Sequence, residues 1–371
     1  MTKEVKGNNF HRFFTSEKRP KLIAGPCGVE SPEQIMRIAS ALRRSGAEVL
    51  RGGIWKPRTR PGSFQGIGTD GLSWLKAAGV ANGMLVTTEV ADPVHVDEAL
   101  SAGIDMLWIG ARTTVNPFLV QRIADALQGV KIPVLIKNPI SPDIELWIGA
   151  IERMANAGLE EIGAVHRGFA SYEQTHYRNA PNWPIPLELK RRFPSMTIFC
   201  DPSHIAGQAD LVSGVAQISM DLNFDGLMVE VHDRPDEALS DKQQQLTPLG
   251  FSEMLSQLVV RSENLEDAPS LTQLTSLRTR IDETDHQLLV HLAKRMELAR
   301  EIGWIKKENK VTVYQLERWS EILRTRPAVA ERLNLSRDFI MKLFEIIHEE
   351  SIHQQTSLMN HSSFTEGKNK E

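Results

Sequence analysis

The sequence contains few cysteines and no long apolar run, and its charges are nearly balanced. Among 371 residues only Cys27 and Cys200 are cysteines, which is too few for a disulfide scaffold and fits a reducing cytoplasm. No uncharged stretch approaches the ~20 residues that cross a bilayer, so we expect no contact with a membrane. Residues 1–20 are polar and lack the apolar core of a signal peptide. The net charge of −4 gives no reason to expect a nucleic-acid partner.

Residues 1–261 alternate strand-like and helix-like segments. Nearly continuous apolar runs indicate strands that are buried on both faces. The expected strands are residues 21–26, 48–53, 85–90, 106–111, 133–138, 161–168, 196–201 and 226–232. Helix-like segments between or after them include residues 32–45, 93–102, 117–127, 143–157 and 248–261. Eight βα units predict a (β/α)₈ TIM barrel, and Gly25-Pro26-Cys27-Gly28 is not the GxGxxG loop of a doubly wound sheet.

The composition changes after a polar segment at residues 262–270, which we interpret as a linker. Beyond it we expect three helices, at about residues 271–309, 314–325 and 337–355, and no strand. The fold class is therefore α/β, a TIM barrel followed by an all-α three-helix domain at residues 271–358. Residues 359–371 are expected to be a disordered tail.

The ends of the predicted strands carry basic side chains. Catalytic residues of a TIM barrel lie at the carboxyl ends of its strands and in the loops that follow. The basic residues at these places are Arg51, Lys56, Arg58, Arg112, Lys137 and Arg167. Any one of them alone is readily explained as the partner of a neighbouring acid. Together they predict substrates with several anionic groups, because Arg and Lys bind phosphate and carboxylate.

The same strand ends carry a set of metal-ligand side chains: Cys27, His204, Glu230 and Asp241. One thiolate, one imidazole and two carboxylates suit a borderline divalent ion, with Mn²⁺ preferred and Fe²⁺, Co²⁺ and Zn²⁺ left open. Spacing does not establish such a site, because the four residues come from different loops. The alternatives are a buried structural cysteine and a hydrogen-bonded histidine.

Six motifs in residues 18–260 resemble the type I 3-deoxy-D-arabino-heptulosonate 7-phosphate synthases. They are Gly25-Pro26-Cys27, Arg51 with Lys56-Pro57-Arg58-Thr59, Ser63-Phe64-Gln65-Gly66, Ile109-Gly110-Ala111-Arg112, Asp201-Pro202-Ser203-His204 and Ser240-Asp241. The resemblance implies condensation of phosphoenolpyruvate with erythrose 4-phosphate. This part of the chain is similar to the compact form that this family shares with the 3-deoxy-octulosonate 8-phosphate synthases.

The resemblance also implies a role for each of these residues. Cys27, His204, Glu230 and Asp241 would hold the metal, and Arg51, Lys56, Arg112, Lys137 and Arg167 would hold phosphoenolpyruvate. Arg58 and Thr59 would contact the sugar phosphate, and Lys56 would also transfer a proton. Cys27 favours a metal-dependent enzyme, and Lys-Pro-Arg-Thr favours the four-carbon sugar. Another aldose remains the alternative for the barrel.

The helical domain presents a second set of basic residues. At 100° per residue, Arg295 and Lys306 lie about 20° apart on their helix, whereas Arg278 is about 100° away. Gln315, Arg318 and Trp319 share a face of the second helix, and Ser351 and Gln355 share a face of the third. A solvated helix surface would explain the basic residues equally well.

The order and spacing of these residues, over about residues 271–358, resemble those of the all-helical chorismate mutases. The resemblance implies that chorismate is held by Arg278 of another chain, Arg295, Arg318 and Ser351, with Lys306 and Gln355 on the ether oxygen. It also implies a homodimer through the helical domain, with a higher oligomer left open. The sequence departs from the family at Gln315 and at Trp319, which replaces a residue expected to bind the substrate hydroxyl.

The sequence therefore predicts a bifunctional enzyme with feedback inhibition by prephenate or chorismate. The rival reading makes the helical domain mainly a regulatory sensor with weak mutase activity. The three expected small-molecule partners are phosphoenolpyruvate, erythrose 4-phosphate and chorismate.

Overall fold

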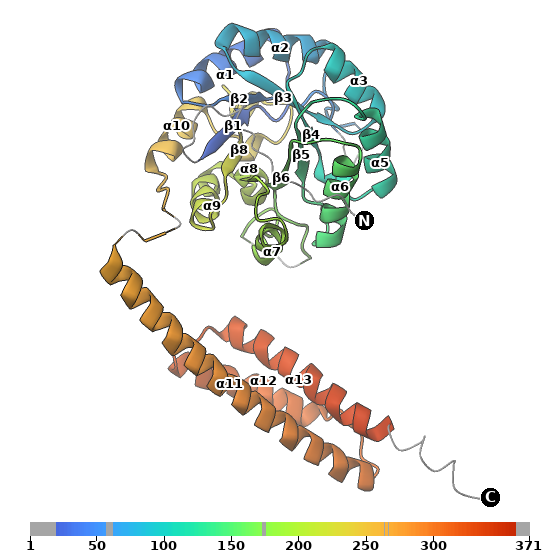
Figure 1. The fold of residues 1–371 in the computed structure, drawn as a ribbon, viewed down its shortest axis with the longest axis vertical. Coiled ribbons are helices and arrows are strands. Elements are labelled where there is room, and N and C mark those ends of the chain that lie inside the picture. Colours follow the sequence, from blue (N-terminus) through green and yellow to red (C-terminus); the bar gives the residue numbers. More distant parts are fainter. Residues whose placement is uncertain (1–19, 57–61, 173–175, 263, 266, 361–371) are drawn as a thin grey trace, which may run out of the picture. The chain divides into compact units, whose positions relative to one another are not determined.

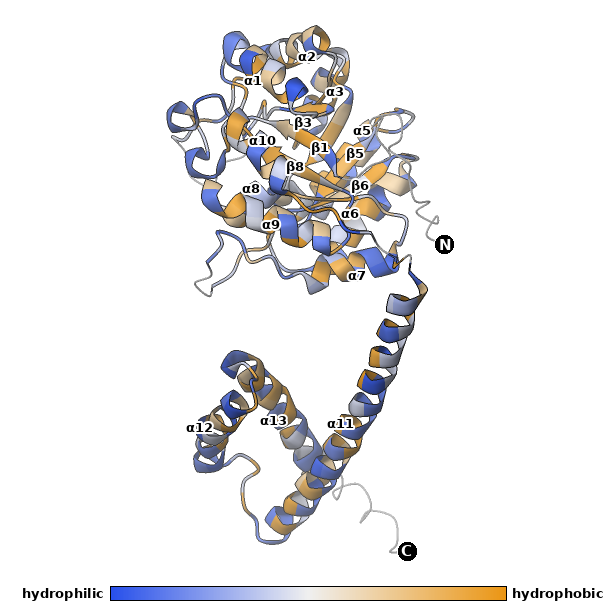
Figure 2. Cartoon of the chain, turned by 90° about the vertical axis from the view of Figure 1, so that its left-hand side faces the viewer, coloured by the Kyte–Doolittle hydropathy of each residue, from blue (hydrophilic) through white to orange (hydrophobic). Residues whose placement is uncertain are grey.

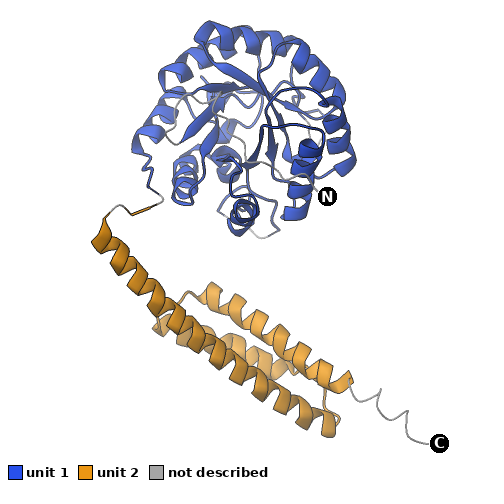
Figure 3. Cartoon of the chain, viewed as in Figure 1, with its two compact units in different colours: residues 1–263 blue, residues 264–371 orange. Residues whose placement is uncertain are grey.

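The structure is a computed structural model that describes residues 20–56, 62–172, 176–262, 264–265 and 267–360. It divides the chain into two compact units, residues 1–263 and residues 264–371 (Figure 3). Each unit has its own buried apolar side chains, such as Trp108 and Trp147 in the first and Ile322 and Ile347 in the second.

The first unit is a closed barrel of parallel strands in which each strand pairs with the next and β8 pairs with β1 (Figure 1). The strands are β1 (Lys21–Gly25), β2 (Val49–Arg51), β3 (Leu85–Val90), β4 (Met106–Ile109), β5 (Val134–Lys137), β6 (Ile162–His166), β7 (Ile198–Cys200) and β8 (Gly226–Glu230). All eight predicted strands are confirmed, and most end one or two residues before the apolar runs do. The runs continue into the loops that carry the site.

Helices surround the barrel (Figure 1). They are α1 (Pro32–Arg44), α2 (Asp70–Asn82), α3 (Pro93–Ser101), α4 (Ala111–Thr114), α5 (Pro117–Ala126), α6 (Ile144–Asn156), α7 (Pro184–Arg192), α8 (Pro202–Ala206), α9 (Ala209–Asp221) and α10 (Pro248–Gln257), with short 3₁₀ turns η2 (Pro235–Glu237) and η3 (Lys242–Gln244). Several begin as expected, with proline in the first turn. Others have a capping side chain, as in α6, where Asp143 accepts hydrogen bonds from Glu145 N and Leu146 N.

Helix α10 is shorter than predicted. It ends at Gln257, not at residue 261. The chain leaves the helix because Leu258 adopts extended backbone angles and Val259 exchanges two hydrogen bonds with the side chain of Gln217 on α9. These contacts satisfy the backbone groups that another helical turn would have paired.

Alternating strand residues fill two separate cores. Inside the barrel lie Ile23, Val49, Met106, Trp108, Leu135, Val165, Phe199 and Met228. Their strand neighbours, including Leu22, Leu50, Leu107 and Val229, face outward and pack against the helices. Successive side chains of a strand point to opposite faces, so both faces of every strand must be apolar. This explains the unbroken apolar runs in the sequence.

The second unit consists of α11 (Ala268–Glu308), α12 (Leu316–Arg332) and α13 (Arg337–Asn360). Helix α11 starts inside the predicted linker, because Asp267 caps it by accepting a hydrogen bond from Ser270 N. Helix α12 continues through the buried Pro327 rather than ending at residue 325. Helix α13 runs past residue 355 to Asn360, where Lys307 donates a hydrogen bond to the carbonyl of Leu358 at 2.7 Å.

Apolar residues are concentrated in the strands of the barrel and are distributed along the helices (Figure 2). Within the described ranges, no helix is both long enough and apolar enough to cross a membrane.

Candidate functional site

The loop after β1 brings Cys27 to the carboxyl end of the barrel. Gly25 permits this path, since a Cβ there would lie 2.0 Å from the carbonyl oxygen of Arg51 on the neighbouring strand, and its φ is +153°. Only glycine allows such a close approach. Cys27 is fully buried, and its backbone N–H donates to Oε1 of Gln245 at 2.9 Å.

Four predicted metal ligands gather at this mouth. The ligand atoms of Cys27, Glu230 and Asp241 all lie within 4.8 Å of one another. The thiol of Cys27 is 3.1 Å from Oδ2 of Asp241. His204 on α8 places Nε2 at 3.8 Å from Oε1 of Glu230. A thiol, an imidazole and two carboxylates from four segments of the chain therefore face one small volume.

The protonation states of this group suit a bound cation. Burial, and then the charge of Glu230, raise the pKa of the Cys27 thiol to about 12, so it is protonated at neutral pH without a cation. Burial opposes ionisation of Asp241, but His204 and Arg178 hold its pKa below the ordinary value. A divalent ion deprotonates a coordinating thiol and relieves the repulsion among such carboxylates.

A buried cationic cluster lies beside the donor group. Lys137 donates a hydrogen bond to Oδ2 of Asp201 at 2.7 Å, and Nη2 of Arg51 donates to Oε1 of Glu230 at 3.1 Å. Both cations lie against the ring of Trp108, at 5.7 and 5.1 Å from its centroid. Nη1 and Nε of Arg51 have no hydrogen-bond partner within the described part of the chain. These buried donors are available for an anionic ligand.

Arg167 and Lys56 extend this cluster. Arg167 donates a hydrogen bond to Oδ1 of Asn179 at 2.8 Å, and burial lowers its pKa to about 10, with Arg178 and Arg112 among the nearby charges. A Cβ on Gly53 would lie 3.0 Å from Nζ of Lys56. Burial alone would lower the pKa of Lys56, but the adjacent Cys27 and Glu230 raise it. Lys56 is therefore a protonated amine beside the donor group.

Two predicted residues, Arg58 and Thr59, lie outside the described residues. The structure brings the other predicted residues of the barrel together at its carboxyl end, where Arg112 follows β4 in α4. Glu89 on β3 lies next to Gly110 and accepts a hydrogen bond from the Trp108 indole at 3.2 Å. It also occupies the space that a side chain at position 110 would need.

Sequence reasoning assigned no role to the residues that connect the two halves of this site. Asp201 contacts Lys137 and also lies 2.8 Å from Nδ1 of His204. Asn179 accepts from Arg167 and donates to the carbonyl oxygen of His204 at 2.6 Å. Arg178 contacts Oδ1 of Asp241 at 3.0 Å. Asp201 could have been found as an acidic residue at a strand end among cations, but the sequence contains no comparable signal for Asn179 or Arg178.

The helical unit contains a pocket of about 420 Å³ that collects most of the residues predicted for it. Among those lining it are Arg295, Lys306, Arg318, Ser351 and Gln355. Arg295 donates a hydrogen bond to Oγ of Ser351 at 2.6 Å, and Lys306 donates to the carbonyl oxygen of Val313 at 2.5 Å. Burial, Arg326 and Arg318 lower the pKa of Arg295, and burial lowers that of Lys306. The pocket is therefore cationic and suits a compact dianion.

The other residues that the sequence singled out in this unit differ in their position relative to the pocket. Arg278 does not line the pocket and is exposed on the first half of α11. Gln315, the N-cap residue of α12, does line it. The ring of Trp319 is not in the lining but stacks on His348, with centroids 4.1 Å apart and planes 7° apart.

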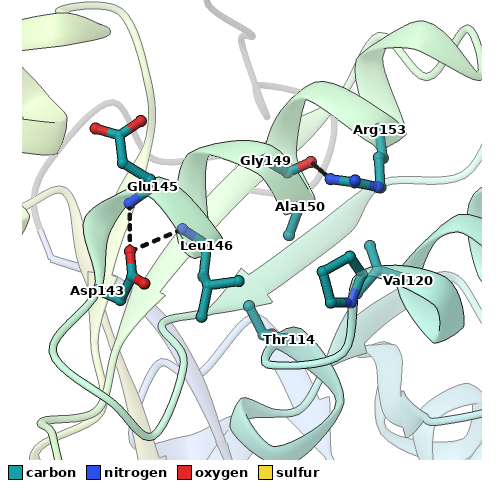
Figure 4. Close-up of a pocket in the computed structure, with 9 residues that line it drawn as sticks. Thr114, Val120, Asp143, Glu145, Leu146, Gly149, Ala150 and Arg153 are labelled. Atoms are coloured by element: carbon teal, nitrogen blue, oxygen red, sulfur yellow. Dashed lines mark hydrogen bonds between the residues drawn. The ribbon is translucent and has the colours of Figure 1, made fainter.

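Another hollow, of about 260 Å³, lies on the outside of the barrel where α4 and α5 approach α6 (Figure 4). Its polar groups serve the helices themselves: Asp143 caps α6, and Arg153 donates a hydrogen bond to the carbonyl oxygen of Gly149 at 2.9 Å. None of the predicted site residues lines it.

Comparison with known proteins separates the two units in the same way. The family model of the DAHP synthetase I family matches residues 10–266, and that of chorismate mutase type II matches residues 277–356. A phospho-2-dehydro-3-deoxyheptonate aldolase of Thermotoga maritima is 35% identical over 247 residues, which cover 67% of this chain and 70% of that protein. A crystal structure of a phospho-2-dehydro-3-deoxyheptonate aldolase from Thermotoga maritima aligns with a TM-score of 0.58 at 35% identity, covering 64% of this chain and 67% of that one.

The helical unit has its own relatives. The T-protein of Enterobacter agglomerans is 37% identical over 81 residues, which cover 22% of each chain. A bifunctional chorismate mutase/prephenate dehydratase of Buchnera aphidicola is 33% identical over 92 residues, which cover 25% of this chain and 24% of that protein.

Proposed function

Because the chain belongs to the DAHP synthetase I family and also carries a chorismate mutase type II domain, we propose that it catalyses two reactions. The barrel condenses phosphoenolpyruvate with erythrose 4-phosphate to give 3-deoxy-D-arabino-heptulosonate 7-phosphate and phosphate. The helical domain rearranges chorismate to prephenate. One observation carries the first assignment: a buried cationic cluster and a Cys/His/Glu/Asp donor group meet at one end of the barrel.

The cationic cluster fits the first substrate. Phosphoenolpyruvate has a carboxylate and a phosphate, and Arg51, Lys137 and Arg167 offer charges on the side of the mouth that Asp201 and Asn179 organise. We assign phosphoenolpyruvate to these residues together with Lys56 and Arg112. Their charge also stabilises the phosphate as it leaves, after water has added to C2.

Cys27, His204, Glu230 and Asp241 form a donor set that fits a divalent cation, with Mn²⁺ preferred. When bound, this ion would act as a Lewis acid toward the sugar aldehyde. The protein groups do the remaining work. Asp201 and Asn179 fix His204, and Lys56 is the protonated amine placed to give a proton to the aldehyde oxygen as C3 of phosphoenolpyruvate attacks.

The sugar is assigned through Arg58 and Thr59, which follow Lys56 in the sequence. Several 2-dehydro-3-deoxyphosphooctonate aldolases, 25–28% identical over about 240–260 residues, also match this chain, so arabinose 5-phosphate is the alternative substrate. Turnover with a series of aldose phosphates distinguishes the two. We expect a strong preference for erythrose 4-phosphate.

The mutase reaction requires no nucleophile. It needs a pocket that holds the compact conformer of a dicarboxylate and stabilises the polarised ether oxygen. We assign Arg295, Arg318 and Ser351 to the carboxylates, and Lys306 and Gln355 to the ether oxygen. Gln355 would donate to the ether oxygen through its amide Nε2–H. Its Oε1 has no hydrogen-bond partner within the described residues, so no such bond fixes the orientation of the amide.

We propose that Arg278 completes this pocket from a second copy of the chain. The first half of α11 has exposed apolar side chains, including Leu277, Ile281, Leu288 and Leu289. Contiguous exposed apolar surface of this kind marks an interface. Measurement of solution mass tests the homodimer: a dimer supports the arrangement, and a monomer at enzymatic concentrations contradicts it.

The first experiment follows loss of phosphoenolpyruvate on adding erythrose 4-phosphate, before and after EDTA treatment and again with Mn²⁺ restored. We expect EDTA to remove the activity and Mn²⁺ to restore it. Cys27→Ala should not recover with metal, whereas Cys200→Ala, which changes a buried cysteine outside the donor group, should. Absence of turnover with metal present would contradict the barrel assignment.

We further propose that prephenate or chorismate inhibits the barrel through the helical domain. The two activities belong to an early and a late step of the same pathway, and both reside on one chain. In the rival reading the helical domain is mainly a sensor with weak mutase activity. Rates with chorismate as substrate separate these two readings.

A further inference from the structure

His348 is a pocket residue to which the mutase reaction gives no role so far. It lies on α13 and lines the 420 Å³ pocket with Arg295, Lys306 and Arg318. Its Nε2 is buried and has no hydrogen-bond partner among the residues that the structure describes. An unsatisfied buried polar atom costs about 1–3 kcal/mol, so it favours a ligand that can bond to it.

Aromatic rings fix the plane of this imidazole. Trp319 stacks on it, with centroids 4.1 Å apart and an interplanar angle of 7°, and Tyr314 lies at 6.1 Å with a tilted ring. The polar edge of His348 therefore has a set direction, and the residue at position 319 acts as its support. A preorganised hydrogen-bonding group is worth more to a ligand than a mobile one.

The surroundings keep the imidazole neutral. The charged groups around it are Arg295 and Lys306 on α11 and Arg318 on α12, and Tyr314 is the adjacent phenol. Burial, followed by the charges of Arg295 and Lys306, lowers the pKa of His348 below its ordinary value. A neutral imidazole exchanges a hydrogen bond with a hydroxyl group, whereas anionic groups are better placed on arginine or lysine.

Chorismate has one polar group that the assignment above leaves without a partner. Its carboxylates go to arginines and its ether oxygen to Lys306 and Gln355, but its ring hydroxyl has none. The uncharged polar side chains of the pocket lining that still have no role are Gln315 and His348. Of these two, His348 has the buried nitrogen without a partner.

We infer that His348 binds the ring hydroxyl of chorismate through Nε2, with Trp319 holding the imidazole in the required plane. This inference rests on the proposed mutase activity and adds a specificity determinant to it. A site built to bond a hydroxyl discriminates against an analogue that lacks it, because the buried nitrogen is then left unpaired.

The test compares kcat/KM for chorismate and for its analogue with hydrogen in place of the ring hydroxyl, using the full-length chain. The wild-type protein should prefer chorismate by about tenfold, the value of one neutral hydrogen bond with its desolvation cost. His348→Leu should lose this factor with chorismate and keep its rate with the analogue. His348→Gln, whose amide nitrogen reaches about as far as Nε2, should restore part of the preference.

His353→Leu is the matched control, since His353 is an exposed histidine on the same helix. It should retain the wild-type preference. Equal losses with both substrates in His348→Leu and His348→Gln would overturn the inference and reduce His348 to a packing residue. A wild-type enzyme that turns over both substrates equally well would also overturn it. A wild-type enzyme that turns over neither would instead contradict the proposed mutase activity.

Discussion

Asp201 is the residue on which the two halves of the barrel site depend. It is fully buried, and Lys137 and His204 both contact its Oδ2, at 2.7 and 2.8 Å. Residues that orient a metal-binding histidine raise metal affinity, and loss of such a residue typically costs 10–100-fold. The same carboxylate balances the charge of Lys137, which is assigned to phosphoenolpyruvate.

We therefore expect Asp201→Asn to weaken Mn²⁺ binding by about 10–100-fold and to raise the KM for phosphoenolpyruvate as well. Metal titration by calorimetry and steady-state kinetics measure the two effects. Asp105→Asn is the control, because Asp105 also pairs with a lysine, Lys76 at 2.9 Å, away from the site. A change in KM alone, with metal affinity retained, would show that Asp201 does not orient His204.

His166 is a buried histidine whose effect on stability depends on pH. Burial lowers its pKa from 6.5 to about 3. Below pH 6.5 the unfolded chain binds a proton at this residue that the folded barrel does not, so stability falls as the pH falls toward 3. One such group accounts for a slope of about 1.4 kcal/mol per pH unit.

His166→Leu should remove this part of the pH dependence. Urea unfolding of both proteins between pH 7 and pH 4 measures it, and the free-energy difference between them should shift in favour of the variant as pH falls. Contributions from other titrating groups cancel in the comparison. Parallel pH profiles for the two proteins would contradict the buried, neutral state of His166.

Individual residues also show where sequence reasoning stops. Four residues could be selected because each ends or closely follows a recognisable strand: Cys27, Arg51, Lys137 and Glu230. Asn179 could not, because it lies in the long loop between β6 and α7, and its importance comes from two hydrogen bonds made only after folding. Polar partners that are distant in sequence have no local pattern.

At the scale of elements, strands were easier to predict than helix ends. Strands buried on both faces leave unbroken apolar runs, so all eight were found. Helix ends depend on contacts with other elements. Helix α10 stops early because Val259 bonds to Gln217, and α13 continues because Lys307 bonds to the carbonyl of Leu358.

The crossing of α11 and α13 depends on Gly303. It is buried inside α11, five residues before the helix ends at Glu308, and glycine inside a helix costs about 1 kcal/mol relative to alanine. A Cβ there would lie 3.1 Å from Cγ of Gln355 and 3.3 Å from Cδ1 of Leu358. The close approach therefore positions Gln355, which is assigned to the ether oxygen of chorismate.

We expect Gly303→Ala to lower kcat for chorismate by about tenfold, with little change in thermal stability, since the gain in helix propensity offsets the displaced contact. Mutase kinetics and a thermal melt measure the two quantities. Ser357→Ala is a control, because Ser357 lies on α13, the helix that carries Gln355, but outside the pocket lining. Unchanged mutase kinetics in Gly303→Ala would remove the positioning role from this crossing.

For the whole molecule, the question is what joining the two domains achieves. Within the described residues, each unit has its own buried apolar side chains and its own group of predicted site residues. Under the proposed feedback, the pocket of the helical domain would sense chorismate or prephenate, a later intermediate of the pathway that the barrel begins. Such sensing requires a free-energy coupling: binding of the ligand in the helical pocket must change the activity of the barrel site.

Arg295→Ala tests this coupling. Arg295 lies in the pocket and bonds to Ser351, so its loss should abolish mutase turnover and also the inhibition of phosphoenolpyruvate consumption by prephenate. Inhibition is scored within each protein as the ratio of rates with and without prephenate. Arg300→Ala, which removes the same side chain from a position of α11 outside the pocket lining, should leave the ratio as in the wild type.

The outcomes assign the sensor. If Arg295→Ala loses both mutase turnover and inhibition by prephenate, catalysis and feedback use the same pocket. A single ligand site that serves both predicts that one substitution removes both. Loss of mutase turnover with inhibition intact would mean that prephenate acts elsewhere, and the barrel itself would then be the place to search. Weak mutase turnover in the wild type, combined with strong inhibition that Arg295→Ala removes, would favour the rival reading, in which the helical domain has kept the ligand site chiefly as a sensor.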